Sequence, residues 1–133
     1  MNGLNYFPPY LYYTSLDQHI FGRLPISASG YATSPAEVVV SNITGSTDDF
    51  AISKDGKKAW IAINGLQDGR HILYEVDIEA KKAGIVANNT LLEATSSVAL
   101  IPGEKGKGLY ITGARDIGNG TTVGAVLKAE VGC

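Results

Sequence analysis

Residues 50–63, Phe50-Ala51-Ile52-Ser53-Lys54-Asp55-Gly56-Lys57-Lys58-Ala59-Trp60-Ile61-Ala62-Ile63, form the stretch that decides the fold. Two apolar runs, 50–52 and 59–63, flank six mostly polar residues that include an Asp-Gly pair. An Asp-Gly pair between apolar runs is typical of a tight β-hairpin. The stretch therefore predicts two antiparallel strands joined by a turn over residues 53–58.

The second strand of this hairpin belongs to a repeat. Its pattern (small or apolar, aromatic, apolar, small) recurs at residues 11–14 and 109–112, so the aromatic positions Tyr12, Trp60 and Tyr110 lie 48 and 50 residues apart. A short apolar run precedes each copy, at 4–6, 50–52 and 98–100, and an alternating run follows each, at 20–26, 72–78 and 125–131. A period near 50 with four strands per unit is typical of β-propeller blades. The alternative is a β-sandwich with accidental internal similarity.

The repeat divides an all-β chain of 133 residues into three predicted blades of four antiparallel strands, over residues 1–42, 43–90 and 91–133. We expect the third blade to lack its outer strand. Closed propellers need at least about four blades, and an open blade invites pairing with another chain. We therefore expect a partner that completes the ring. The first choice is a separate N-terminal half, and a second copy of the chain is the alternative.

The composition excludes several classes of function. With 11 basic and 13 acidic residues and a net charge of −2, the chain has no excess of positive charge for binding nucleic acid. No apolar run approaches the roughly 18 residues of a membrane span. Its one cysteine, Cys133, can form neither an internal disulfide nor a thiolate metal cluster. Three glycosylation sequons in predicted loops, at Asn42, Asn88 and Asn119, favour the secretory pathway or secretion.

Three segments carry a resemblance to a known family: Asn2-Gly3-Leu4, Tyr10-Leu11-Tyr12-Tyr13-Thr14-Ser15-Leu16-Asp17 and Thr47-Asp48-Asp49-Phe50-Ala51-Ile52-Ser53-Lys54-Asp55-Gly56. The chain resembles the senescence-marker-protein/gluconolactonase family, in particular its fungal branch, over nearly its whole length. The resemblance implies a six-bladed propeller, of which this chain matches the C-terminal half. It also implies a small-molecule substrate bound at one mouth of the central channel.

The resemblance implies two chemistries. Metal-dependent lactonases of the family hold one divalent cation, Ca²⁺ or Zn²⁺, and Asn2 and Asp48 match two of its ligands. Other fungal members steer hetero-Diels–Alder reactions between a heterodiene and a terpenoid alkene, which need an apolar pocket and no cofactor. The usual Pro-Asp-Gly context is here Thr47-Asp48-Asp49, and this difference favours the cycloaddition. A non-catalytic binding platform is a third alternative.

The candidate site residues come from the strand starts and from the loops between second and third strands, which share one end of a propeller. Strand starts supply Asn2, Asp48, Asp49 and Ser96, and the loops supply Asp17, His19, Asn64 and Arg115. We expect Asp48, Arg115 and His19 to act in catalysis, and Asn2, Asp17, Asp49, Asn64 and Ser96 to bind substrate. Tyr6, Tyr12, Tyr13, Phe21, Phe50, Trp60 and Tyr110 offer aromatic surface, although most of them alternate into the packing between blades, and Trp60 and Tyr110 are expected in the core of the ring. The longer loops 65–70 and 114–122 are expected to rim the pocket.

Overall fold

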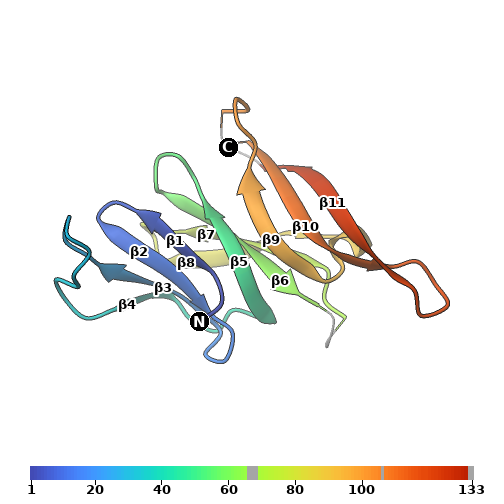
Figure 1. Cartoon of the computed structure of the whole chain (residues 1–133), viewed down its shortest axis with the longest axis horizontal. Coiled ribbons are helices and arrows are strands. Elements are labelled where there is room, and N and C mark those ends of the chain that lie inside the picture. Colours follow the sequence, from blue (N-terminus) through green and yellow to red (C-terminus); the bar gives the residue numbers. More distant parts are fainter. Residues whose placement is uncertain (66–68, 106, 132–133) are drawn as a thin grey trace.

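A computed structural model describes residues 1–65, 69–105 and 107–131, and within them it contains eleven strands in three antiparallel sheets. The first sheet has the order β1 (Leu4–Phe7), β2 (Tyr10–Ser15), β3 (Ile20–Pro25), β4 (Glu37–Val40). The second has β5 (Ser46–Ile52), β6 (Lys58–Asn64), β7 (Ile72–Asp77), β8 (Lys82–Asn88), and the third has β9 (Thr95–Leu100), β10 (Gly108–Asp116), β11 (Thr122–Glu130). A short 3₁₀ turn, η1 (Thr90–Leu92), precedes β9. The sheets follow one another along the long axis of the molecule (Figure 1).

The predicted hairpin joins β5 to β6, with Phe50 opposite Ile61 and Ile52 opposite Ala59. Its turn is held by short polar contacts: the Ser53 hydroxyl donates to the Asp55 carboxylate at 2.6 Å. Gly56 has a φ of +71°, a conformation that residues with a Cβ rarely adopt, and its N–H donates to the Ser53 carbonyl at 2.9 Å. The Asp-Gly pair thus sets the register of the central sheet.

Each sheet is a blade with two unlike faces. We call the face directed toward the preceding blade the N-side face and the face directed toward the following blade the C-side face. Between the first and second blades, Tyr12 and Phe21 pack against Phe50, with 5.1 Å between the ring centroids of Phe21 and Phe50. Between the second and third blades, Trp60 and its neighbours pack against the N-side face of the third blade, which carries Val98, Leu109 and Ile111. Along the second strand of each blade, side chains alternate between the two faces of the sheet. This alternation fills the two interblade cores.

The all-β class and the three-blade arrangement predicted from the repeat are confirmed, and the third blade has three strands among the described residues. Two local expectations are wrong. Asn88 was predicted in a loop but is the last residue of β8. The segment 114–122 is only partly loop: β10 continues to Asp116, β11 begins at Thr122, and residues 117–121 form a short turn in which Gly118, Asn119 and Gly120 all have positive φ. No helix in the described part of the chain has the length and apolar character to span a membrane.

Candidate functional site

A polar cluster forms where the first and second blades meet at one end of the sheets. Asn2 lies just before β1, and its side-chain amide donates to the Thr47 carbonyl of β5 at 3.2 Å. The side chains of Asn2 and Asn64 both hydrogen-bond the Asp48 carboxylate. Asn64, the last residue of β6, reaches Asp48 because it pairs with Ser46 at the start of β5. The structure thus brings three of the predicted site residues together, and we call them the Asp48 cluster.

Asp48 lies half-buried, and this placement changes its acidity. Desolvation raises the pKa of Asp48 above its ordinary value, and the negative charge of Asp49 adds to the rise. The hydrogen bonds from the Asn64 side chain, the Asp49 backbone and the Asn2 side chain oppose this rise. A carboxylate held by two amides and partly withdrawn from water is a feature found at many functional sites.

Thr14 of β2 hydrogen-bonds the backbone on both sides of the Asp48 cluster. Its side chain is fully buried, and its hydroxyl accepts from the Gly3 N–H at 2.8 Å and donates to the Asp48 carbonyl at 2.7 Å. One hydroxyl therefore ties the segment before β1 and the backbone of β5 to β2. Sequence reasoning did not select Thr14, because a threonine inside an alternating strand carries no mark of such a role.

The predicted residues of the second and third blades make their own contacts. The Asp49 carboxylate accepts from the Ser97 hydroxyl at 2.7 Å and so links β5 to β9. Ser96 is exposed, and its hydroxyl donates to the Thr112 carbonyl at 3.4 Å within the third blade. Arg115 pairs with Val123 in the part of the β10–β11 hairpin that extends past the last residue paired with β9. No hydrogen bond or ion pair seen among the described residues joins Ser96 or Arg115 to the Asp48 cluster.

His19 and Asp17 lie in the turn between β2 and β3, at the same end of the sheets as the Asp48 cluster. Both side chains are exposed. The Nδ1 atom of His19 is 2.8 Å from the Gly45 carbonyl oxygen, a contact that bridges the first and second blades. The loop 65–70 belongs to this end too, but its residues 66–68 lie outside the described residues. His19 and Asp17 therefore lie at the end of the sheets where the site was predicted, and their roles in catalysis and substrate binding stay predictions.

Four of the seven aromatic residues considered for cycloaddition pack in the interblade cores, as expected for most of them. Tyr12, Phe21, Phe50 and Trp60 are each at most 2% exposed and pack between blades. Tyr6 and Tyr110 are about half-exposed, on the first and third blades respectively. The cycloaddition remains a prediction that rests on the family resemblance. The three sequon asparagines, Asn42, Asn88 and Asn119, are exposed, and their glycosylation also stays a prediction.

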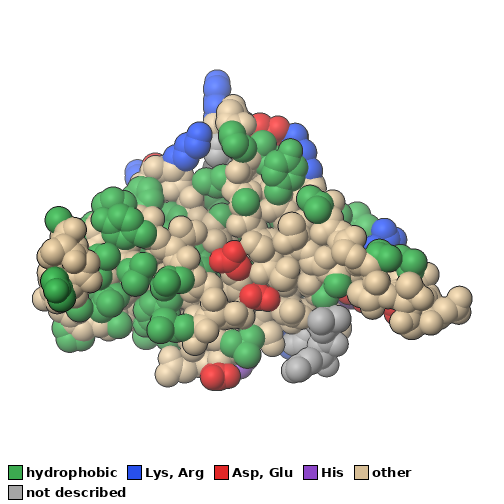
Figure 2. Space-filling model, in the orientation of Figure 1, with side chains coloured by type: hydrophobic (Ala, Val, Ile, Leu, Met, Phe, Trp, Pro, Cys, Tyr) green, Lys and Arg blue, Asp and Glu red, His purple; other side chains and the backbone are tan. Residues whose placement is uncertain are grey.

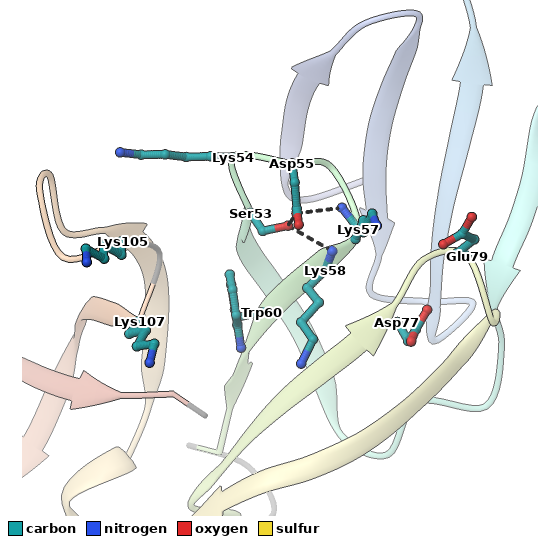
Figure 3. Close-up of a pocket in the computed structure, with 10 residues that line it drawn as sticks. All are labelled: Ser53, Lys54, Asp55, Lys57, Lys58, Trp60, Asp77, Glu79, Lys105 and Lys107. Atoms are coloured by element: carbon teal, nitrogen blue, oxygen red, sulfur yellow. Dashed lines mark hydrogen bonds between the residues drawn. The ribbon is translucent and has the colours of Figure 1, made fainter. Parts of the chain in front are cut away.

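A cavity lies at the opposite end of the blades from the Asp48 cluster. It has a volume of about 430 Å³ and is lined by Ser53, Lys54, Asp55, Lys57, Lys58, Trp60, Asp77, Glu79, Lys105 and Lys107. Figure 3 shows Lys54 and Lys105 on one side of it and Asp77 and Glu79 on the other. Two of its charged residues make contacts within the fold: Asp55 accepts from Ser53 in the hairpin turn, and Lys58 pairs with Glu75 at 2.6 Å. Among these residues, sequence reasoning considered only Trp60 for the pocket, because the charged ones lie in or next to the turns between strands.

Comparison with known proteins yields the fold. No family model matches the chain, and no curated protein matches its sequence. Among solved structures, a luciferin-regenerating enzyme superposes with a TM-score of 0.70 at 17% identity, covering 97% of this chain and 44% of that one. A chain of a nidogen–laminin complex gives 0.65 at 15% identity, over 84% of this chain and 39% of that one. A candidate 6-phosphogluconolactonase from Bacteroides uniformis gives 0.58 at 15% identity, over 98% and 41%.

These likenesses extend over less than half of each of the three matched chains, whereas they cover most of this one. At 15–17% identity they bear on the fold alone. The three sheets are accordingly blades of a β-propeller.

Proposed function

We propose that this chain contributes the substrate-binding mouth of a small-molecule hydrolase that opens lactones. The observation that carries the proposal is the convergence of Asn2 and Asn64 on the half-buried carboxylate of Asp48. Two of the similar structures are enzymes by name, and one of those names includes a lactonase. The proposal selects the metal-dependent hydrolysis over the cycloaddition, because four of the seven aromatic side chains that were expected to offer surface to a cycloaddition, Tyr12, Phe21, Phe50 and Trp60, are packed between blades.

The chemistry of the donor set fits part of a hard-cation site. Asp48 offers a carboxylate and Asn2 an amide oxygen, and oxygen ligands of this kind suit Ca²⁺ better than Zn²⁺. The described residues contain no group of three or more His, Cys, Asp or Glu side chains placed to hold a metal. The residues described here therefore supply only part of the ligand set. A bound divalent cation would act as a Lewis acid toward a lactone carbonyl.

The other residues of the site position these two. Asn64 donates to Asp48 and so fixes the orientation of its carboxylate. Thr14 holds the backbone of Asp48 through the carbonyl, and Gly3 next to Asn2 through the N–H. Orientation by such packed and hydrogen-bonded neighbours is what a preorganised site requires.

Replacing Asp48 with Asn should abolish the response to Ca²⁺ and lower lactone hydrolysis about 100-fold, because the charged ligand is lost while the shape is kept. Two measurements on the wild type and on Asp48→Asn check this. One is the rise of the melting temperature with added Ca²⁺, and the other is the rate of opening of a panel of aldonolactones.

The matched control is Glu79→Gln. Glu79 is an exposed carboxylate beside the cavity at the opposite end of the blades, so its loss should leave both readouts unchanged. Equal hydrolysis and equal Ca²⁺ response in the wild type and in Asp48→Asn would refute the proposed function.

A further inference from the structure

The cavity at the end of the blades opposite the Asp48 cluster lies between the turns of two neighbouring blades. The β5–β6 turn of the second blade brings Lys54 to it, and the β9–β10 turn of the third blade brings Lys105 and Lys107. Five lysines and three carboxylates line the cavity, although the chain as a whole has a net charge of −2. The cavity is formed between two blades that are already packed together, and positive charge gathers in it.

Three of these lysines have no carboxylate partner among the described residues. The ion pairs of the described part of the chain do not include Lys54, Lys105 or Lys107, and all three side chains are exposed. Of the three carboxylates that line the cavity, Asp55 accepts hydrogen bonds within its own turn. The other two lie on the far side, whereas the Lys54 side chain extends toward the side that carries the other two lysines (Figure 3). We call Lys54, Lys105 and Lys107 the lysine site.

The corresponding groove between the first and second blades lacks such a cluster among its described lining residues. It has a volume of about 310 Å³, and Tyr12 lines it at the repeat position that Trp60 holds in the other cavity. The first blade has Pro8-Pro9 as its β1–β2 turn, without a lysine, and the Arg23 guanidinium that lines the groove pairs with Glu37 at 2.7 Å. The lysine site is therefore particular to one groove and is not a general property of the repeat.

We propose that the cavity between the second and third blades binds a small phosphorylated compound through the lysine site. Like charges that are brought together repel one another, and a bound anion removes this repulsion. The ammonium group of lysine binds phosphate as a compact point charge, whereas the planar fork of arginine matches carboxylates better, and the described lining residues include no arginine. The chemistry of the site therefore favours phosphate groups over carboxylates.

The size and place of the cavity favour a small ligand. Its volume of about 430 Å³ lies within the range of roughly 300–1,000 Å³ that is typical of small-molecule sites. Figure 2 shows basic side chains gathered at the upper end of the visible face, where Figure 1 places the β9–β10 turn. The net negative charge of the chain does not favour a long polyanion such as nucleic acid. The cavity and the Asp48 cluster lie at opposite ends of the blades, so this ligand is distinct from the proposed lactone substrate.

Titration with inorganic pyrophosphate at pH 7.5, without divalent cations, tests the proposal by calorimetry and by tryptophan fluorescence. Trp60 is the one tryptophan of the chain and lines the same cavity, so its emission reports binding there. The wild type should bind pyrophosphate more tightly than citrate, a carboxylate anion of similar charge. The double variant Lys105→Gln/Lys107→Gln should raise the dissociation constant for pyrophosphate about 10-fold, because two exposed charge contacts are lost.

The matched control is Lys81→Gln/Lys82→Gln, which removes the same charge from two exposed lysines that do not line the cavity. It should bind pyrophosphate like the wild type. All four lysines are exposed, so both double variants should keep the wild-type circular dichroism spectrum. A wild type that does not bind pyrophosphate, citrate bound as tightly, an equal loss of affinity in the two double variants, or a short DNA duplex bound more tightly than pyrophosphate would each overturn the proposal.

Discussion

Replacing Trp60 with Ala should lower the free energy of unfolding by about 3–5 kcal/mol, the usual cost of truncating a buried large aromatic side chain. Trp60 is 2% exposed and lies in the core between the second and third blades. Its indole N–H donates to the Glu75 carboxylate at 2.9 Å, so the substitution also removes a hydrogen bond to a charged group. Urea unfolding at one fixed protein concentration, followed by circular dichroism, measures the effect.

The matched control is Tyr31→Ala, since Tyr31 is an aromatic residue that is 75% exposed. Its loss should change the free energy of unfolding by no more than about 0.5 kcal/mol. If Trp60→Ala were as mild as Tyr31→Ala, the second interblade core would not hold the blades together as described.

Thr14→Val is the second substitution for which we expect a large effect. Valine has nearly the shape of threonine, so the packing is kept while two partners, the buried Gly3 N–H and the partly buried Asp48 carbonyl, lose their hydrogen bonds. Each unsatisfied buried group costs about 1–3 kcal/mol, so the loss of stability should be about 2–5 kcal/mol. Urea unfolding again gives the value.

Two comparisons separate the hydroxyl from the methyl group. Thr14→Ser keeps both hydrogen bonds and loses only the methyl group, so it should lower the free energy of unfolding by only about 1 kcal/mol. Thr95→Val removes a single bond, from the Thr95 hydroxyl to the Ile63 carbonyl at 2.7 Å, and should cost about 1–3 kcal/mol. A Thr14→Ser variant as unstable as Thr14→Val would contradict the role given to the hydroxyl.

The blades could be predicted because their signals are local. Strand periodicity and the Asp-Gly turn are properties of a few consecutive residues, and the repeat of Tyr12, Trp60 and Tyr110 placed them at equivalent positions. Burial of those residues could not be predicted in the same way, since it depends on the presence of a following blade. Tyr110 matches Trp60 in pattern, yet it is 45% exposed and Trp60 is 2% exposed.

The site was predictable to the extent that it follows the register. In the sequence, Asn2 and Asp48 each lie two residues before the matched positions Leu4 and Phe50, and the structure joins them through contacts at one end of the blades. Asp49 accepts a hydrogen bond from Ser97, which lies 48 residues away in the sequence. The sequence near either residue does not predict this hydrogen bond. Arg115 was expected in the loop 114–122. In the structure a short turn follows Asp116, so β10 continues through Arg115.

We propose that Asp48 serves the lactone-opening site although its burial costs the fold stability, and the melting temperatures of the wild type and of Asp48→Asn between pH 3 and pH 8 test this most directly. Because burial raises the pKa of Asp48, the folded state keeps its proton over a pH range in which the unfolded state has already released it, so the contribution of Asp48 to stability falls as the pH rises through that range. Asp48→Asn should therefore melt a few degrees higher than the wild type at pH 7, and this advantage should disappear below pH 3.8. A variant that melts lower than the wild type at pH 7 would show that the charge stabilises the fold, and would contradict the account.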